Sequence, residues 1–182
     1  MPKLTDKFFF FVKYFPTLGQ FNKRQRFFLR ITLLAICLYG IDRVSKYIAL
    51  SYLHKPIVLI PNLLQLNVVG NKNFLFYVEA PTSIVFLTTA LVSISLLWMA
   101  IKEHRQGNDH HVAFLIFVFI GAFSNILDRV RYGFVVDFIS IPFWSVFNLA
   151  DIYIILGVLA LALSLWKEEH APQANKTISK TS

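Results

Sequence analysis

Two aspartates, Asp137 and Asp151, lie in the apolar stretch FVVDFISIPFWSVFNLAD, which contains no lysine or arginine. An ionised carboxylate that is removed from water without a cation is costly, so two such groups brought together are expected to share one proton. One carboxylate can then take a proton from a water that attacks an amide carbonyl, while the other, protonated, donates a hydrogen bond to that carbonyl. The pattern therefore suggests peptide hydrolysis by an aspartate dyad.

Each aspartate also has a structural explanation. Asn148 lies three positions before Asp151, which is the spacing of a capping box at the start of a helix. In the first turn of a helix the dipole favours a negative charge. Asp137 could instead form a salt bridge with Arg129 or Arg131. These alternatives stay open at the level of the residues alone.

The composition indicates that this stretch belongs to a membrane protein. The 182 residues are 56% hydrophobic with a mean hydropathy of +0.58, and many of the 19 phenylalanines stand in continuous apolar runs. We predict a mainly α-helical fold with four transmembrane helices at about 29–50, 82–101, 110–127 and 147–166. The charge-free cores of the first and last are too short, so the first must continue through Asp42 and the last must begin before Asp151.

Basic residues orient these spans and account for the net charge of +8 better than nucleic acid does. Twelve of the eighteen lysines and arginines lie in the first 30 residues, between the second and third spans, or after the fourth, which predicts that both termini are cytoplasmic. They are Lys3, Lys7, Lys13, Lys23, Arg24, Arg26, Arg30, Lys102, Arg105, Lys167, Lys176 and Lys180.

Polar side chains at membrane depth then gather at the extracytoplasmic leaflet, where they mark a candidate site. They are Asp42, Lys46, Asn125, Asp128 and Asp151. The spacing of Asp42 and Lys46, four apart, also predicts an internal ion pair. The adjacent Asp128 and Arg129 are expected to form a structural pair or an interfacial anchor. Gly121, one turn before Asn125 on the third span, allows close approach of another helix.

The segments outside the spans differ in character. Short β-prone runs at 55–81 and 132–144, broken by proline and glycine, predict a small extracytoplasmic sheet lying on the membrane. Residues 1–28 form a basic, aromatic cytoplasmic extension, expected to be an interfacial helix rather than a signal peptide. Residues 167–182 are expected to be a disordered cytoplasmic tail.

Other hydrolytic chemistries find no support. All five histidines lie in loops or at span ends, so Ser–His catalysis within the membrane lacks its base. No H-E-x-x-H pattern or phosphate-binding glycine loop occurs, and a solvated loop explains NDHH better than a metal site. We therefore expect neither a metal nor a cofactor.

Three motifs, in order, resemble lipoprotein signal peptidase, the type II signal peptidase of bacterial membranes: DRVSK, GAFSNILDRVRYGFVVDFI and FNLAD. The resemblance runs over residues 42–151. It implies an aspartic endopeptidase of the bacterial inner membrane that removes the signal peptide of a prolipoprotein, cutting just before a cysteine that carries diacylglycerol. We expect a monomer whose partners are these substrates and membrane lipid, with no nucleic acid.

Carried over residue by residue, the resemblance implies that Asp137 and Asp151 are the catalytic pair. The supporting or substrate-contacting residues that it implies are Gly121, Asn125, Asp128, Arg129, Asn148, Ala150, Asp42, Lys46 and Asn71. Two features depart from the family. The stretch NKNFLF has Asn73 and Leu75 where the family has glycine and alanine, and only 14 positions separate Asp137 from Asp151, which is short.

Two other classes of membrane protein compete with this interpretation. An ion-coupled transporter also uses buried carboxylates, although usually at the membrane midplane. A non-catalytic scaffold would keep the spans without needing both Asp137 and Asp151.

Overall fold

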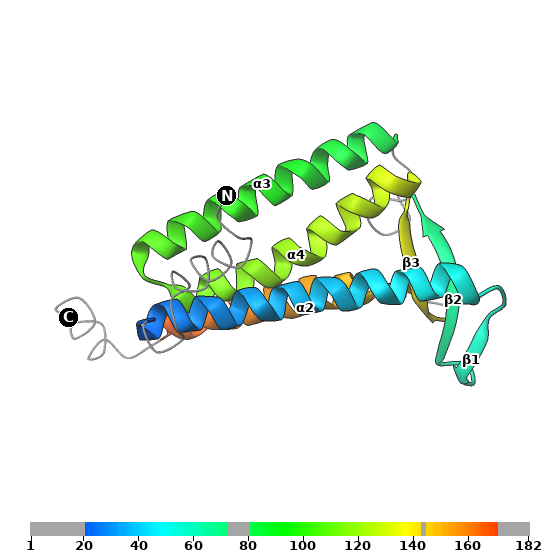
Figure 1. The fold of residues 1–182 in the computed structure, drawn as a ribbon, viewed down its shortest axis with the longest axis horizontal. Coiled ribbons are helices and arrows are strands. Elements are labelled where there is room, and N and C mark those ends of the chain that lie inside the picture. The colour runs from blue at the N-terminus through cyan, green and yellow to red at the C-terminus, as the bar shows by residue number, and fades with distance from the viewer. Residues whose placement is uncertain (1–20, 73–80, 143–144, 171–182) are drawn as a thin grey trace, which may run out of the picture.

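The structure, a computed structural model, describes residues 21–72, 81–142 and 145–170. In chain order the elements are α2 (Lys23–Tyr52), β1 (Ile57–Ile60), β2 (Leu64–Asn71), α3 (Thr82–Gln106), α4 (Asp109–Tyr132), β3 (Val135–Ile141), β4 (Ser145–Phe147) and α5 (Leu149–Glu169). The helices lie side by side, and the strands lie at one end of them (Figure 1). Residues 1–20 and 171–182, with most of the predicted extension and tail, lie outside the described residues.

Three of the helices, α3, α4 and α5, are long and apolar enough to cross a membrane, as predicted for these spans. Their outer faces carry exposed apolar side chains such as Leu91 and Ile94 of α3 and Leu159 of α5. The helix α2 has 30 residues and begins six positions before the predicted span, because Asn22 and Gln25 form a capping box there.

The central helix is α4, which packs against α5, α3 and α2. Its contact with α5 is close because small residues face the partner helix on each side. A Cβ on Gly121 would lie 2.5 Å from the carbonyl oxygen of Ala150, and a Cβ on Gly157 of α5 would lie 2.7 Å from Val118. Glycine at these two positions therefore lets the start of α5 lie against α4.

The four strands form one antiparallel sheet in the order β1-β2-β3-β4, as the β-prone runs predicted. Gly133 ends α4 with φ +78°, a left-handed conformation that favours glycine, and so turns the chain from α4 into β3. In the register of β2 and β3, Val69 pairs with Asp137. Pairing of Ile139 with Phe147 then returns the chain through β4 to the start of α5. The pairing of β3 with β4 accommodates the short separation of the two aspartates. Asn73 and Leu75 lie outside the described residues.

We expect Gly121→Ala to destabilise the protein by about 1–3 kcal/mol, since its methyl group would overlap the backbone of α5. The matched control is Gly40→Ala on α2, where an added Cβ meets nothing within 4 Å. That control should leave stability unchanged or raise it slightly, because alanine is the better helix former. The thermal unfolding midpoint (Tm) of both variants in detergent checks this, and equal midpoints would contradict the close helix contact.

Candidate active site

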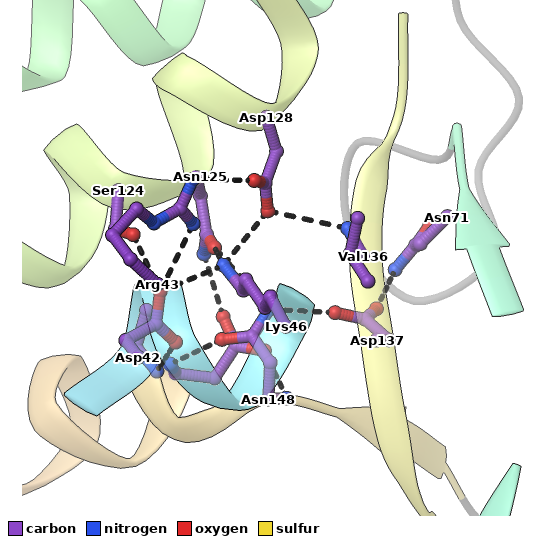
Figure 2. A network of polar contacts seen from close by, with 12 residues as sticks. Asp42, Arg43, Lys46, Asn71, Ser124, Asn125, Asp128, Val136, Asp137 and Asn148 are labelled. Carbon is purple, nitrogen blue, oxygen red and sulfur yellow. Dashed lines mark hydrogen bonds and ion pairs between the residues drawn. The ribbon is translucent and has the colours of Figure 1, made fainter. Parts of the chain in front are cut away.

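Side chains from α2, α4, β2, β3 and the start of α5 meet at the sheet end of the helices (Figure 2). Asp137 lies in the middle of β3, and Asp151 lies in the first turn of α5. The structure brings to the same place Asp42, Lys46, Asn71, Asn125, Asp128 and Asn148, which the sequence singled out. This cluster is largely buried, with Asp42, Asp128 and Asn148 at 0% exposure.

Asn148 links the two aspartates directly. Its side-chain Nδ2 donates to Asp137 Oδ1 at 2.7 Å, and its backbone N–H donates to Asp151 Oδ2 at 3.0 Å. Its Oδ1 accepts the backbone N–H of Asp151 at 3.1 Å, so the capping box that the spacing predicted is present. The cap and the link between the carboxylates are thus made by one residue.

Asn125 of α4 forms a second link. Its Nδ2 donates to Asp151 Oδ1 at 2.8 Å, while its Oδ1 accepts from Lys46 Nζ at 3.0 Å and from Asn148 Nδ2 at 3.2 Å. A lysine ammonium can only donate, so Lys46 fixes which end of the Asn125 amide faces Asp151. In the same way the backbone N–H of Asp151 fixes the orientation of Asn148.

The carboxylates of Asp137 and Asp151 are satisfied by amides. Asn71 Nδ2 donates to Asp137 Oδ2 at 2.8 Å, which gives each of the four carboxylate oxygens one N–H donor. Among the described residues neither aspartate forms an ion pair, so the alternative of a salt bridge from Asp137 is wrong. Arg129 lies near enough to attract both aspartates electrostatically but makes no hydrogen bond to them in the described part of the chain.

The surroundings of Asp137 favour its protonated form. Burial raises the pKa of Asp137 to about 7, and the negative charge of Asp151 acts in the same direction. Hydrogen bonds from Asn71 and Asn148 and the charge of Lys46 offset part of this effect. A carboxyl group with such a pKa can hold or release a proton near neutral pH.

Asp42 and Asp128 are held by cations instead. Lys46 Nζ lies 3.1 Å from Asp42 Oδ2, which is the predicted pair four residues apart, and 2.7 Å from Asp128 Oδ2. Asp128 also pairs with Arg43 at 2.8 Å. The expected pairing of Asp128 with Arg129 is therefore wrong, because adjacent residues on a helix point in different directions.

Two functional candidates were missed by the sequence reasoning. Arg43 contacts both Asp42 and Asp128, and the Ser124 hydroxyl donates to Asp42 Oδ2 at 2.5 Å. A signal was available for Arg43, since it precedes Lys46 by three positions and shares its helix face. Among the described residues, no group of three or more His, Cys, Asp or Glu is placed to hold a metal ion.

We expect Asn148→Ser and Asn148→Ala to separate two roles of Asn148, the capping of α5 and the hydrogen bond to Asp137. Serine can still cap α5, so the free energy of unfolding of this variant should lie within about 1 kcal/mol of the wild-type value. Alanine cannot cap the helix and should lower the free energy of unfolding by about 1–2 kcal/mol more. Neither residue can donate to Asp137 as the amide does. The peptide hydrolysis that the sequence predicts should therefore fall at least about tenfold in both variants, measured beside Tm. Full activity in the serine variant would show that the link is dispensable.

The raised pKa of Asp137 makes stability depend on pH. Between the usual carboxyl pKa of about 4 and the value of about 7 in the protein, the folded state binds more protons than the unfolded chain. The free energy of unfolding should therefore fall as pH rises through this range, by an amount on the order of a few kcal/mol.

Asp137→Asn should flatten this dependence, as Tm measured in detergent between about pH 5 and pH 8 would show. Glu169→Gln, which changes an exposed carboxylate at the far end of α5, should keep the wild-type slope. Parallel profiles for wild type and Asp137→Asn would contradict the assignment.

Comparison with known proteins gives consistent matches. A family model described as signal peptidase (SPase) II matches residues 34–167. The lipoprotein signal peptidase of Chlorobaculum tepidum is 34% identical over 159 residues, covering 76% of this chain and 97% of that protein. The lipoprotein signal peptidase of Streptococcus thermophilus is 33% identical over 139 residues, covering 74% and 91%.

A solved structure agrees with these matches. It is described as a bacterial membrane enzyme, has a TM-score of 0.69 and 27% identity, and the match covers 78% of this chain and 90% of that chain. The family match extends over more than half of the chain and includes every residue of the cluster around Asp137 and Asp151. The chain therefore belongs to the signal peptidase II family, the lipoprotein signal peptidases, and is a bacterial membrane protein with peptidase activity.

Proposed function

We propose that this protein is an aspartic endopeptidase that removes the signal peptide from diacylglyceryl-modified prolipoproteins, cutting on the N-terminal side of the lipidated cysteine. The observation that carries the proposal is the contact of one fully buried residue, Asn148, with both Asp137 and Asp151. Two carboxylates held by one residue, in a member of a peptidase family, support a dyad that shares one proton.

The two aspartates are assigned different roles. Asp151 lies in the first turn of α5, where the helix dipole favours the carboxylate, and its Asn125 donor is polarised by Lys46. Asp151 is therefore the base. Asp137, with its pKa raised to about 7, holds the shared proton and is the acid.

In the reaction Asp151 takes a proton from a water molecule, whose oxygen forms a bond to the scissile carbonyl carbon. Asp137 gives its proton to the carbonyl oxygen, which yields a neutral tetrahedral diol. Asp151 then protonates the leaving nitrogen as the C–N bond breaks, while Asp137 takes back the proton from a diol hydroxyl. Both carboxyl groups return to their starting states.

The arrangement of the elements supports an extracytoplasmic site. We take α2 as the fourth span, so the start of α2 and the ends of α3 and α5, where basic residues gather, lie together at the end away from the sheet (Figure 1). If that end is cytoplasmic, the dyad and the sheet face outward. All four side chains of β1 are apolar and exposed, which suits a sheet edge lying on lipid. A site at the helix ends also favours a peptidase over a transporter with a midplane site.

We expect purified protein in detergent to cleave a diacylglyceryl-modified prolipoprotein immediately before its lipidated cysteine. Asp137→Asn and Asp151→Asn should each lower kcat at least about 10³-fold, because each removes a group that moves a proton in the reaction. Mass spectrometry of the products locates the cut, and the thermal unfolding midpoint shows whether each variant is folded.

The matched control is Glu169→Gln, which should cleave at the wild-type rate. The same substrate without diacylglycerol should be cut poorly. Folded aspartate variants that cleave normally would refute the dyad, and wild-type protein that cuts at another bond would refute the assigned substrate.

A further inference from the structure

The two non-catalytic carboxylates are attached to the chain directly beside the dyad. Asp128 Oδ2 accepts the backbone N–H of Val136 at 3.2 Å, and Val136 immediately precedes Asp137. Asp42 Oδ1 accepts the backbone N–H of Ala150 at 3.0 Å, and Ala150 immediately precedes Asp151. The residue before each aspartate of the dyad is thus held through its backbone N–H by a second carboxylate. These two anchors, the carboxylates of Asp42 and Asp128, hold the backbone immediately before each aspartate of the dyad.

Two cations of α2 connect these anchors, and each reaches both of them. Lys46 Nζ lies 3.1 Å from Asp42 and 2.7 Å from Asp128. Arg43 Nη2 lies 3.0 Å from Asp42, and Arg43 Nη1 lies 2.8 Å from Asp128 (Figure 2). Two carboxylates and two cations together are neutral, which lowers the cost of burying them.

The two cations differ in what they can fix. Lys46 is a point charge that forms ion pairs with both anchors and donates a hydrogen bond to the Asn125 side chain. Arg43 is a planar fork, so the separation of its two terminal nitrogens is set by covalent geometry. Its Nε is buried and has no hydrogen-bond partner among the described residues, so the guanidinium is held by its two terminal nitrogens, Nη1 and Nη2. A rigid spacer between two carboxylates is what such a fork provides.

We propose that Arg43 is a positioning residue for hydrolysis, acting as the spacer that sets the separation of Asp137 and Asp151 through the anchors Asp128 and Asp42. This inference rests on the proposed dyad function. It differs from a purely structural role, in which Arg43 only neutralises buried charge. Loss of charge balance would lower the amount of folded protein, whereas loss of the spacer would change the chemistry of the molecules that do fold.

The test is steady-state cleavage of the diacylglyceryl-modified prolipoprotein across pH by wild type, Arg43→Met and Arg43→Lys, with Tm measured for each. We expect kcat to fall about 10²-fold in Arg43→Met and about tenfold in Arg43→Lys, since small misplacements of reacting groups have effects of this size. KM should change less than about threefold, because Arg43 acts through the dyad and not on the substrate.

The pH profile separates positioning from folding. A wider separation weakens the repulsion between the two carboxylates, so the shared proton should be lost more easily. The alkaline limb of the kcat profile should therefore move to lower pH in Arg43→Lys, which keeps the positive charge. In Arg43→Met the loss of the cation favours protonated carboxyl groups and opposes this shift. A smaller folded fraction would lower the amplitude without moving that limb. If Arg43→Met does not fold, the alkaline limb of the kcat profile of Arg43→Lys decides between positioning and folding.

The matched control is Arg26→Met, an exposed arginine on the same helix, which should leave kcat and the pH profile unchanged. An unmoved alkaline limb in Arg43→Lys, or a raised KM at unchanged kcat in either variant, would overturn the proposal. Failure of both variants to fold would overturn it too, since Arg43 would then serve folding. Inactive wild type, or active Asp137→Asn and Asp151→Asn, would instead refute the proposed function.

Discussion

Four aspartates lie close together at the sheet end of the helix bundle, and removing their charges from water is a large cost that the fold has to offset. The protein meets this cost in two different ways. Asp42 and Asp128 are held by two cations of α2, whereas Asp137 and Asp151 receive only amide N–H donors among the described residues. A cation bound directly to the second pair would favour two full negative charges and would oppose a shared proton. The distribution of cations therefore distinguishes the carboxylates of Asp42 and Asp128 from those of the proposed dyad.

The start of α5 shows how local structure and chemistry are combined. A side chain at this position would be needed in any case, because the first turn of a helix leaves backbone N–H groups without partners. Asn148 fills that need with its oxygen and uses its nitrogen to hold Asp137. A change that frays the start of the helix would therefore also disturb the dyad, and helix stability and site geometry cannot vary independently.

Much of the architecture could be predicted from the sequence, because lipid imposes simple length and charge rules on helices. The spans in α3 and α4 follow from charge-free runs, and the span in α5 follows once it is allowed to begin before Asp151. The sheet follows from β-prone segments outside the spans. Asp137 and Asp151 stood out because of their apolar surroundings. The backbone partners of Asp42 and Asp128 could not be predicted, since a backbone N–H carries no sequence signal and its partner depends on how distant elements pack. The wrong pairing of Asp128 came from sequence adjacency, which tertiary packing overrode.

The order of the elements along the chain has a consequence for biosynthesis. A ribosome makes α2, the sheet strands and α4 before α5, which is the last helix that the structure describes. Until α5 has joined the others, Asp137 lacks its carboxylate neighbour, and the Asn148 link has not formed. A partly made chain would contain one aspartate of the pair in a membrane crowded with other polypeptides. On the proposed mechanism, hydrolytic competence would thus appear only at the end of assembly, which protects neighbouring proteins from an unfinished enzyme.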